Sequence, residues 1–313
     1  HQGKLIVDAT VAPQAIRYPT DLSLLNEARE ITETIIDQLY LHTDLKQKPR
    51  TYRQKARKDF LAIAKQRKPK PKARRSAIKA QLNYLRRNLG HIEHLLQFFP
   101  QGQPLPLSNT LLYRYWVIQH LYTQQRQMFQ TGEKRCDHRI VSISQPYVRP
   151  IVRGKLNKPV EFGAKLSVSL NGEGISCVDQ LRWDAFNEGA DLIDQVNAYH
   201  ARHGYYPEVV LADPAYGTKE NRNALKALGI RYGGKPLGRP PKKTTTEYKQ
   251  QKQQRKEDYR QRIPIEGKFG QSKQAYGLDR IQAKRADTSV AWINSIFMMM
   301  NLWVLLKAFF WLY

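Results

Sequence analysis

The feature that most constrains the fold is a long helical stretch that separates one apolar strand from all the others. Residues 4–11 (KLIVDATV) read as a strand, and apolar residues then recur at helical spacing over residues 21–40 and 105–131. Strand-like patterns return only after residue 140, in IVSISQPYVRPIVRG, PVEFGAKLSVSL and GISCVDQLRW. The helical region over about residues 22–130 therefore lies between the first and the second predicted strands as a large insertion in an α/β domain.

Short strands and helices alternate in the second half of the chain. The pattern predicts helices over residues 184–202, 219–228 and 244–262, and short strands at 207–213 and 230–234. Asp21 or Ser23 is expected to cap the helix over 21–40, and Asp184 the helix that follows it. Because a proline inside a helix lacks a donor and clashes with the preceding turn, Pro264 predicts a break, with Glu266 in the first turn of a new helix.

The last segment, residues 290–313, is apolar over most of its length. It approaches the ~20 residues that span a bilayer, which leaves a membrane helix as one interpretation. Asn294, Asn301 and Lys307 recur inside it, and no upstream segment resembles a membrane protein. We expect a buried core helix.

The charge of the chain points to a polyanionic partner. With 52 Lys and Arg against 27 Asp and Glu, the formal net charge is +25, which favours nucleic acid, although a membrane surface or ribosomal RNA would also fit. Residues 46–87 alone hold 17 Lys or Arg and one acid, Asp59. This run is either a solvated helical face or a DNA-binding surface, and its length and sign favour DNA. Two cysteines build no disulfide framework, so we expect a reducing cytoplasm.

Three carboxylates lie where a structural role has little to offer. Asp8 interrupts an apolar strand, Asp213 ends the strand-like segment VVLAD, and Glu266 lies in a basic segment. Enzymes that cut phosphodiesters without a protein nucleophile use acids from separate elements to hold divalent metals. The alternatives are a cap for the turn after Asp213 and, for Glu266, a surface salt bridge with Arg262 or with neighbours on the Lys273 side.

The segment YRQRIPIEGKFGQSK surrounds Glu266 with groups that bind phosphate. Tyr259, Arg262, Glu266 and Lys273 are separated by two, three and six residues. On a continuous helix these spacings place all four near one face. An acid among such groups suits an enzyme that acts on a nucleic-acid backbone. The chain contains no P-loop, dinucleotide fingerprint or G-x-S-x-G elbow.

These spacings resemble the Y-(2)-R-(3)-E-(6)-K signature of DDE transposases, and the surrounding words resemble the IS5 group of bacterial insertion sequences. DATVAPQAIRYPTDLSLLNEARE, LADPAYGTKENR, RIPIEGKFGQSKQAYGLDRI and WINSIFMMMNLWVLL carry the resemblance. It implies an RNase H-like fold of the retroviral integrase superfamily, with a mixed five-stranded sheet flanked by helices. It also implies that Asp8, Asp213 and Glu266 bind two Mg²⁺ ions, for which Mn²⁺ substitutes.

The same resemblance implies the activity and the partners. Such enzymes cleave DNA at the ends of the element and transfer the freed strand into target DNA, so the partners are the terminal inverted repeats, the target and a second copy bound to DNA, and no membrane. We expect a catalytic domain formed by residues 1–21 and 135–313, with 22–134 as a basic helical insertion that binds DNA or supports assembly. A further N-terminal domain is expected before His1, and the location is the bacterial cytoplasm, at the nucleoid.

Further residues are candidates for DNA contact. The resemblance assigns phosphate contacts to Tyr259, Arg262 and Lys273, and Lys268 lies in the same segment. In KPLGRPPKK, the residues around Arg239 resemble the Arg-Pro segment with which some proteins enter the DNA minor groove, and a plain basic loop is the alternative. Trp183 could stack on an unpaired base or could belong to the core. The remaining candidates in the loop are Lys242 and Lys243.

Other functions fit part of this pattern. A structure-selective nuclease or resolvase with the same fold would cut with these acids and never join DNA. A DNA-binding protein derived from a transposase would keep the fold without turnover. A membrane-associated basic protein would depend on the last apolar segment.

Overall fold

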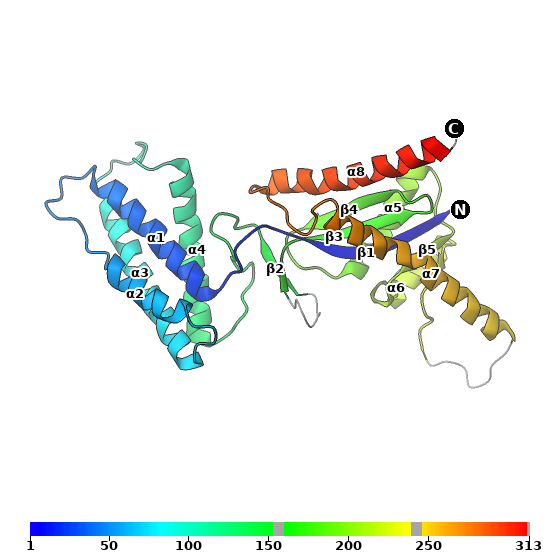
Figure 1. Ribbon diagram of the computed structural model, residues 1–313, viewed down its shortest axis with the longest axis horizontal. Helices are drawn as coiled ribbons and strands as arrows, with labels where there is room; N and C mark the ends of the chain where they lie inside the picture. Colours follow the sequence, from blue (N-terminus) through cyan, green and yellow to red (C-terminus); the bar gives the residue numbers. More distant parts are fainter. Residues whose placement is uncertain (153–159, 239–245, 312–313) are drawn as a thin grey trace. The chain divides into compact units, whose positions relative to one another are not determined.

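The structure is a computed structural model that describes residues 1–152, 160–238 and 246–311 (Figure 1). The chain forms two compact units: His1–Ala15 with Pro150–Tyr313, and Ile16–Arg149. The first contains a β-sheet with its helices, and the second consists of helices. The helical unit is longer than the insertion expected at 22–134, because Ile140 and Ile143 lie in its apolar core. For the same reason, the strand expected from residue 140 is confined to Arg149–Val152.

The sheet combines parallel and antiparallel pairs. Its strands are β1 (Lys4–Pro13), β2 (Arg149–Val152), β3 (Val160–Asn171), β4 (Ser176–Arg182), β5 (Val209–Ala212) and β6 (Arg231–Tyr232). They follow the order β2-β3-β1-β5-β6, and β4 also pairs with β3. β3 is antiparallel to β1 and β4, whereas β5 is parallel to β1 and β6. The predicted mixed sheet is confirmed, but the predicted number of strands was wrong: the described residues form six strands instead of five, because the short β2 is added.

Alternation along β1 and β5 directs their side chains to two faces of the sheet. One face packs against α5 (Leu192–His203) and α6 (Lys219–Ala227), and its strand residues are Leu5, Val7, Val210 and Ala212. The other face packs against α7 (Thr246–Gln274) through a cluster of Ile6, Leu170, Leu211 and Ile265. The alternation therefore places Asp8, two residues after Ile6, on the α7 face.

The helix before β5 begins later than predicted. A 3-10 turn, η1 (Glu188–Asp191), leads into α5. Asn187 caps this 3-10 turn, since its side chain accepts a hydrogen bond from the Gly189 N–H. The N-cap of α5 is Asp191, without a side-chain hydrogen bond, and not the predicted Asp184.

Helix α7 is continuous through Pro264, so the predicted break there is wrong. Proline withholds one donor, from the carbonyl four residues earlier at Arg260, whose side chain is exposed and whose turn can be solvated. Ile265 is fully buried against the sheet directly after the proline. Arg262 and Glu266 also bond to each other across it. Packing and this ion pair hold the helix together on both sides of Pro264.

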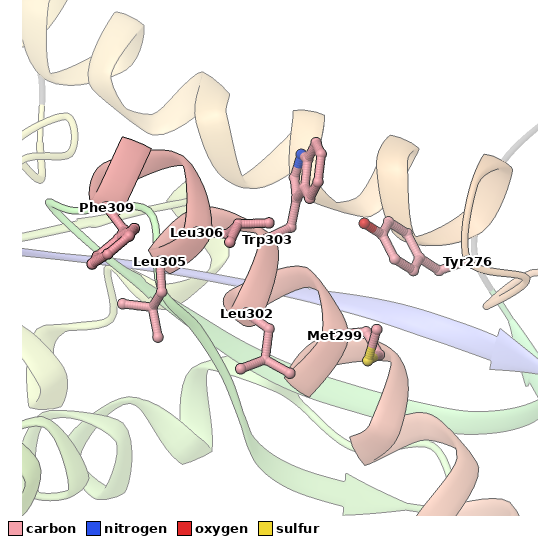
Figure 2. Close-up of a pocket in the computed structure, with 7 residues that line it drawn as sticks. All are labelled: Tyr276, Met299, Leu302, Trp303, Leu305, Leu306 and Phe309. Atoms are coloured by element: carbon pink, nitrogen blue, oxygen red, sulfur yellow. The ribbon is translucent and has the colours of Figure 1, made fainter. Parts of the chain in front are cut away.

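Helix α8 (Ala286–Trp311) covers the sheet only along part of its surface. Its buried residues are Ser289, Ile293, Ile296, Phe297 and Met300. Asn301 then bonds to the backbone of Ser176 in β4. Beyond it, exposed apolar side chains surround an open pocket of about 530 Å³, lined by Tyr276, Met299, Leu302, Trp303, Leu305, Leu306 and Phe309 (Figure 2).

The expectation that α8 is a buried core helix is therefore wrong for its C-terminal half. The apolar cluster beneath the helix, which includes Leu278 and Ile281, takes in α8 residues only as far as Met300, and most side chains after Asn301 are exposed. Among the described residues, the helix Ala286–Phe310 is long and apolar enough to cross a membrane by length and composition, with 28% of the apolar window buried.

The helical unit contains α1 (Asp21–Tyr40), α2 (Arg53–Ala64), α3 (Pro71–Leu96) and α4 (Asn109–Thr131). The cap of α1 differs from both expected residues: Thr20 is the N-cap, and Ser23 completes a capping box with it. Pro71 begins α3, where its missing donor costs nothing. Ser108 caps α4 by accepting from the Leu111 N–H.

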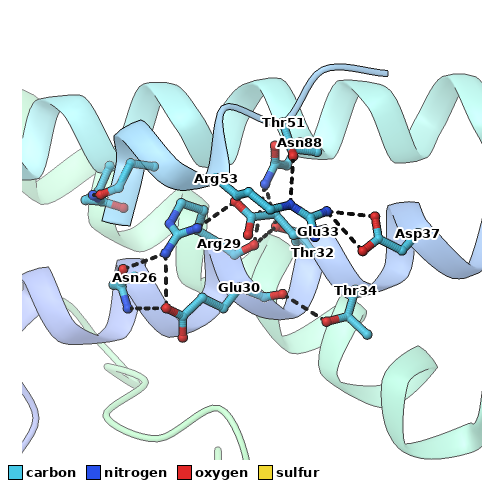
Figure 3. A network of polar contacts seen from close by, with 12 residues as sticks. Asn26, Arg29, Glu30, Thr32, Glu33, Thr34, Asp37, Thr51, Arg53 and Asn88 are labelled. Atoms are coloured by element: carbon cyan, nitrogen blue, oxygen red, sulfur yellow. Dashed lines mark hydrogen bonds and ion pairs between the residues drawn. The ribbon is translucent and has the colours of Figure 1, made fainter. Parts of the chain in front are cut away.

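The helices enclose an apolar core that surrounds a buried arginine. Leu residues of α1 and α3 and Ile118 and Leu121 of α4 form the core. Arg29, only 1% exposed, donates to Asn26 and Glu33, and Asn88 of α3 donates to Thr32 of α1 (Figure 3). Pairing offsets the cost of burying this charge, so the network fixes how α1 and α3 pack.

Candidate functional site

Asp8 lies in the centre of the sheet with only 18% of its side chain exposed. Its Oδ1 accepts from the Ala9 N–H at 2.8 Å, and its Oδ2 accepts from Arg262 Nη1 at 3.3 Å. Burial raises the pKa of Asp8 from 3.8 to about 6, although both contacts oppose the rise. The charges of Glu188 and Asp213 add to it. A carboxyl group of this kind binds a cation readily, because its charge is poorly solvated.

Asp213 is placed next to Asp8 by the register of the two strands. Pairing of β1 with β5 ends at Val7 and Ala212, so Asp8 and Asp213 are the next residues on neighbouring strands, which lie about 4.8 Å apart. Asp213 also caps the 3-10 turn η2 (Pro214–Tyr216), since its Oδ1 accepts from the Ala215 N–H at 3.1 Å. Asp213 therefore acts as a cap, which was its alternative role, and also lies beside Asp8.

Glu266 reaches the same place from α7. Arg262 Nη2 donates to Glu266 Oε1 at 2.6 Å, and the Glu266 side chain is 53% exposed. The salt bridge between Glu266 and Arg262, which was the alternative role, is therefore present. It is not a surface salt bridge, because the Arg262 side chain is only 11% exposed and its guanidinium also binds Asp8. One cation joins two of the three predicted acids.

The sequence signature lies along the edge of the buried stripe of α7. Arg262 belongs to the stripe with Asp258, Ile265 and Ser272. Tyr259 is 63% exposed, and its ring lies 5.7 Å from the Arg262 guanidinium carbon. The continuous helix thus brings the signature residues to one side, as its spacing predicts.

The other predicted DNA contacts lie in varied environments. Lys273 is half-buried near the end of α7. Lys268 is also half-buried, and burial together with the charge of Lys307 lowers its pKa. Trp183 packs against the apolar cluster beneath α8, as expected for a core residue. The loop candidates lie outside the described residues: Arg239, Lys242 and Lys243.

Several residues near the acids were missed by sequence reasoning. Glu188 lies close enough to raise the pKa of Asp8. Lys165 forms an ion pair with Glu188, with 2.8 Å between Lys165 Nζ and Glu188 Oε1. Tyr216 is fully buried, and within the described part of the chain its hydroxyl has no hydrogen-bond partner. Burial and the charges of Glu188 and Asp8 raise the pKa of Tyr216. Tyr232 donates to the Asp213 carbonyl. No local pattern indicates Glu188, but Tyr216 follows Asp213 closely enough to be suspected.

The donor set has the right chemistry for a hard divalent cation, since all three predicted ligands are carboxylates. Asp8 and Glu266 already share one positive group, Arg262. Among the described residues, however, no three His, Cys, Asp or Glu side chains are grouped closely enough to hold a metal ion. The site thus presents Asp8 and Glu266 joined by one guanidinium, with Asp213 directly after the strand that pairs beside Asp8.

Residues 210–303 match the model of a family described as the transposase DDE domain. The match spans β5, α7 and most of α8, and so includes Asp213, Arg262, Glu266 and Lys273. No curated protein and no solved structure matches the chain significantly. The match supports a DDE transposase, and with it an enzyme that acts on DNA.

Proposed function

We propose that this chain is the catalytic part of a bacterial DDE transposase of the IS5 group. It cuts DNA at the ends of an insertion sequence and joins the freed 3′-hydroxyl to target DNA. One observation carries the proposal: Arg262 links Asp8 of β1 to Glu266 of α7, and Asp213 follows the strand that pairs beside Asp8. The similarity of residues 210–303 to the transposase DDE domain supports it from sequence.

The order of the strands supports an RNase H-like fold as part of this proposal. The central β1 has an antiparallel neighbour, β3, on one side and a parallel neighbour, β5, on the other. The resemblance assigns catalysis to an acid on the first strand, an acid after the fourth strand and an acid on a following helix. Asp8 lies on β1, Glu266 lies on α7, and Asp213 follows β5, which is the fourth strand in chain order when the short β2 is left aside.

The three acids are the residues that would hold two Mg²⁺ ions, with Mn²⁺ as a substitute. When bound, the ions would activate the attacking water or hydroxyl and stabilise the leaving oxygen. The strands and the N–H groups of Ala9 and Ala215 fix Asp8 and Asp213. Glu266 is half-exposed on its helix and can change rotamer, so it is the adjustable member.

Each unit by itself offers positive groups for contact with DNA. Near the acids, Tyr259, Arg262, Lys268 and Lys273 are the candidates for phosphate contact. In the helical unit, exposed cations of α2 supply a second surface, for the terminal repeats or for assembly of two copies on paired ends. This function places the protein at the nucleoid in the bacterial cytoplasm.

The test is cleavage and joining by an Asp213→Asn variant. Asparagine keeps an oxygen that can accept from the Ala215 N–H, so the turn is preserved while the charge is removed. With labelled duplex carrying an element end, we expect Mg²⁺-dependent nicking and joining by the wild type and neither by the variant, with DNA binding retained. Asp194→Asn, on the exposed side of α5, is the matched control and should keep both activities.

The outcomes separate the proposal from its alternatives. Nicking by the wild type without any joined product would favour a structure-selective nuclease. Binding without cleavage would favour a DNA-binding protein derived from a transposase. Unchanged cleavage by Asp213→Asn would reject the assignment of the acids.

A further inference from the structure

A groove in the helical unit combines apolar and cationic side chains. It encloses about 450 Å³ and is lined mainly by the first turns of α3, the last turns of α4 and the residues that follow α4. Ile78, Met128 and Phe129 form its apolar part, and Met128 is buried. The volume lies within the range of about 300–1,000 Å³ that is typical of small-molecule sites. The groove therefore suits a compact ligand or one unit of a polymer.

Cations outnumber acids around the groove. Its charged residues are Arg74, Arg75, Lys134, Asp21 and Glu133. The Asp21 carboxylate is already paired, because its Oδ1 accepts from Arg139 Nη2 at 2.7 Å. Glu133 is exposed, so solvent screens its charge. A negatively charged ligand would therefore meet a positive rim.

One of these cations has a fixed orientation. The Arg75 guanidinium carbon lies 4.4 Å from the centre of the Phe129 ring, and Arg75 Nη2 donates to the Phe129 carbonyl at 2.9 Å. These two contacts hold the guanidinium against the ring. Because Arg75 is still exposed, its guanidinium can stack on a second planar group, and unpaired nucleic-acid bases stack on such planes.

The segment after α4 is held in place as well. Arg139 Nη1 donates to the Lys134 carbonyl at 2.8 Å, while Nη2 of the same guanidinium binds Asp21 in the first turn of α1. This arrangement ties the segment to α1 and keeps Lys134 beside the groove. Lys134 and Arg74 are both exposed, as contact with a phosphate requires.

We propose that this groove binds one unpaired nucleotide of a DNA strand, with the base stacked on Arg75 and the phosphate at Arg74 and Lys134. The inference rests on the proposed function for the source of the nucleotide. Bases inside a duplex are stacked on one another and must leave the stack before they can enter such a site. The groove would therefore hold DNA at a point where its strands are separated.

An acidic peptide is the competing ligand. Its carboxylates would also meet the positive rim, but it would gain little beyond charge from a guanidinium that is held against an aromatic ring. A planar cation beside apolar side chains favours a nucleotide, whose base is planar and whose phosphate is charged.

The experiment compares two labelled DNAs by fluorescence anisotropy, with the full 313-residue chain in EDTA. One is a blunt duplex, and the other is a shorter duplex with an unpaired 3′ extension and the same number of phosphates. One stacked base should make the extended DNA bind about tenfold more tightly. A 2-aminopurine base in the extension should lose fluorescence on binding, because stacking quenches it.

Arg74→Gln and Lys134→Gln each remove one exposed cation from the groove. Each should reduce the preference for the extended DNA to about threefold, because a charge-assisted contact with the phosphate is lost, and should restore part of the 2-aminopurine fluorescence. Arg86→Gln is the matched control, since Arg86 is exposed on the same helix and does not line the groove. It should weaken binding of both DNAs equally and leave the preference unchanged.

Competitors identify the ligand. If the groove takes a nucleotide of a strand, dAMP should displace the extended DNA only at millimolar concentration, and inorganic phosphate should be weaker still. Displacement by micromolar dAMP would overturn the assignment to a DNA strand in favour of a free nucleotide. Equal displacement by phosphate would overturn the inference in favour of a simple anion site, and stronger displacement by poly-glutamate would do so in favour of an acidic peptide.

Equal affinity of the wild type for both DNAs would overturn the inference, as would an unchanged preference in Arg74→Gln and Lys134→Gln. Cleavage by the wild type that is lost in Asp213→Asn would still support the proposed function, so only this inference would fail. If the wild type binds neither DNA, the proposed function fails with it.

Discussion

Asp8 keeps a carboxyl group where its charge is poorly solvated. A position inside a central strand offers few ways to relieve such a charge, and the Ala9 N–H and Arg262 relieve it only in part. The folded protein therefore favours the protonated acid, or the acid with a cation beside it. At the scale of a residue, Asp8 is therefore a carboxyl group whose ionised form needs a positive partner.

This unfavourable charge predicts a pH dependence of stability in metal-free buffer. The folded-state pKa of about 6 lies above the ordinary 3.8, so between these values the folded protein holds a proton that the unfolded chain has lost. Stability therefore falls as the pH rises through this window and stays lowered above it. Asp8→Asn should be more stable than the wild type by about 3 kcal/mol near pH 8, with a difference that shrinks toward pH 4.

Denaturant unfolding of both proteins in EDTA at several pH values measures this difference. Asp194→Asn, at an exposed site, should show no comparable trend. A gap between Asp8→Asn and the wild type that is equal at pH 4 and pH 8 would contradict the prediction.

Tyr216 gives a second prediction at this scale. Its hydroxyl is buried near several carboxylates and, within the described part of the chain, has no hydrogen-bond partner. Leaving such a group unpaired is unfavourable, so Tyr216→Phe should raise the free energy of unfolding by about 1 kcal/mol. Chemical denaturation in EDTA measures it. A loss of stability would mean that the hydroxyl is satisfied in solution, for example by water.

At the scale of an element, α7 is the decisive piece, because it carries Arg262 and Glu266 past a proline that would ordinarily interrupt a helix. Buried Ile265 and the ion pair across the proline compensate for the missing donor. The helix consequently holds its charged residues at fixed spacing over the α7 face of the sheet.

Pro264→Ala tests how much the proline costs. Alanine restores the N–H that the Arg260 carbonyl lacks and removes the ring that crowds the preceding turn. We expect the free energy of unfolding to rise by about 1–3 kcal/mol, with helical circular dichroism unchanged or slightly increased. A less stable variant would show that the helix depends on a distortion that only proline supplies.

Local patterns predicted most elements, since periodicity and turn residues act locally. They gave β1, α1, α4, β3 and β5 to within a few residues, and they singled out Asp8 and Asp213 as acids at strands. They failed where distant packing decides. Pro264 is accommodated by contacts with the sheet, and most apolar side chains in the second half of α8 are exposed in the part of the chain that the structure describes. Glu188 escaped notice because only the fold brings it toward Asp8.

For the whole molecule, charge and apolar surface are concentrated in different elements. Cations dominate α2 and the start of α3, whereas the exposed apolar residues gather on α8. Neither surface is needed to hold its own unit together, because buried residues elsewhere form the cores. Both are therefore available for partners.

The basic surface predicts how DNA binding responds to salt. Affinity for DNA falls as salt rises, and each phosphate contact makes the plot of log affinity against log salt concentration steeper by about 0.9. If three exposed cations of α2 all contact DNA, replacing them by glutamine should make this plot shallower by about 3. These cations are Lys55, Arg57 and Lys58. Fluorescence anisotropy over a salt series measures it, and an unchanged slope would remove α2 from the DNA-binding surface.

The two sides of α8 predict opposite effects of substitution. Met300 is 1% exposed, so Met300→Ala should cost about 2–5 kcal/mol of stability. Leu302 and Leu306 are 50% and 44% exposed, so serine at both should change stability by less than about 0.5 kcal/mol.

Because a contiguous exposed apolar surface favours association, the double variant should show a lower average mass than the wild type in sedimentation velocity at equal concentration. If the wild type instead stays soluble only in detergent and the double variant does not need it, α8 contacts lipid, and the interpretation of this helix as part of a DNA-processing domain fails.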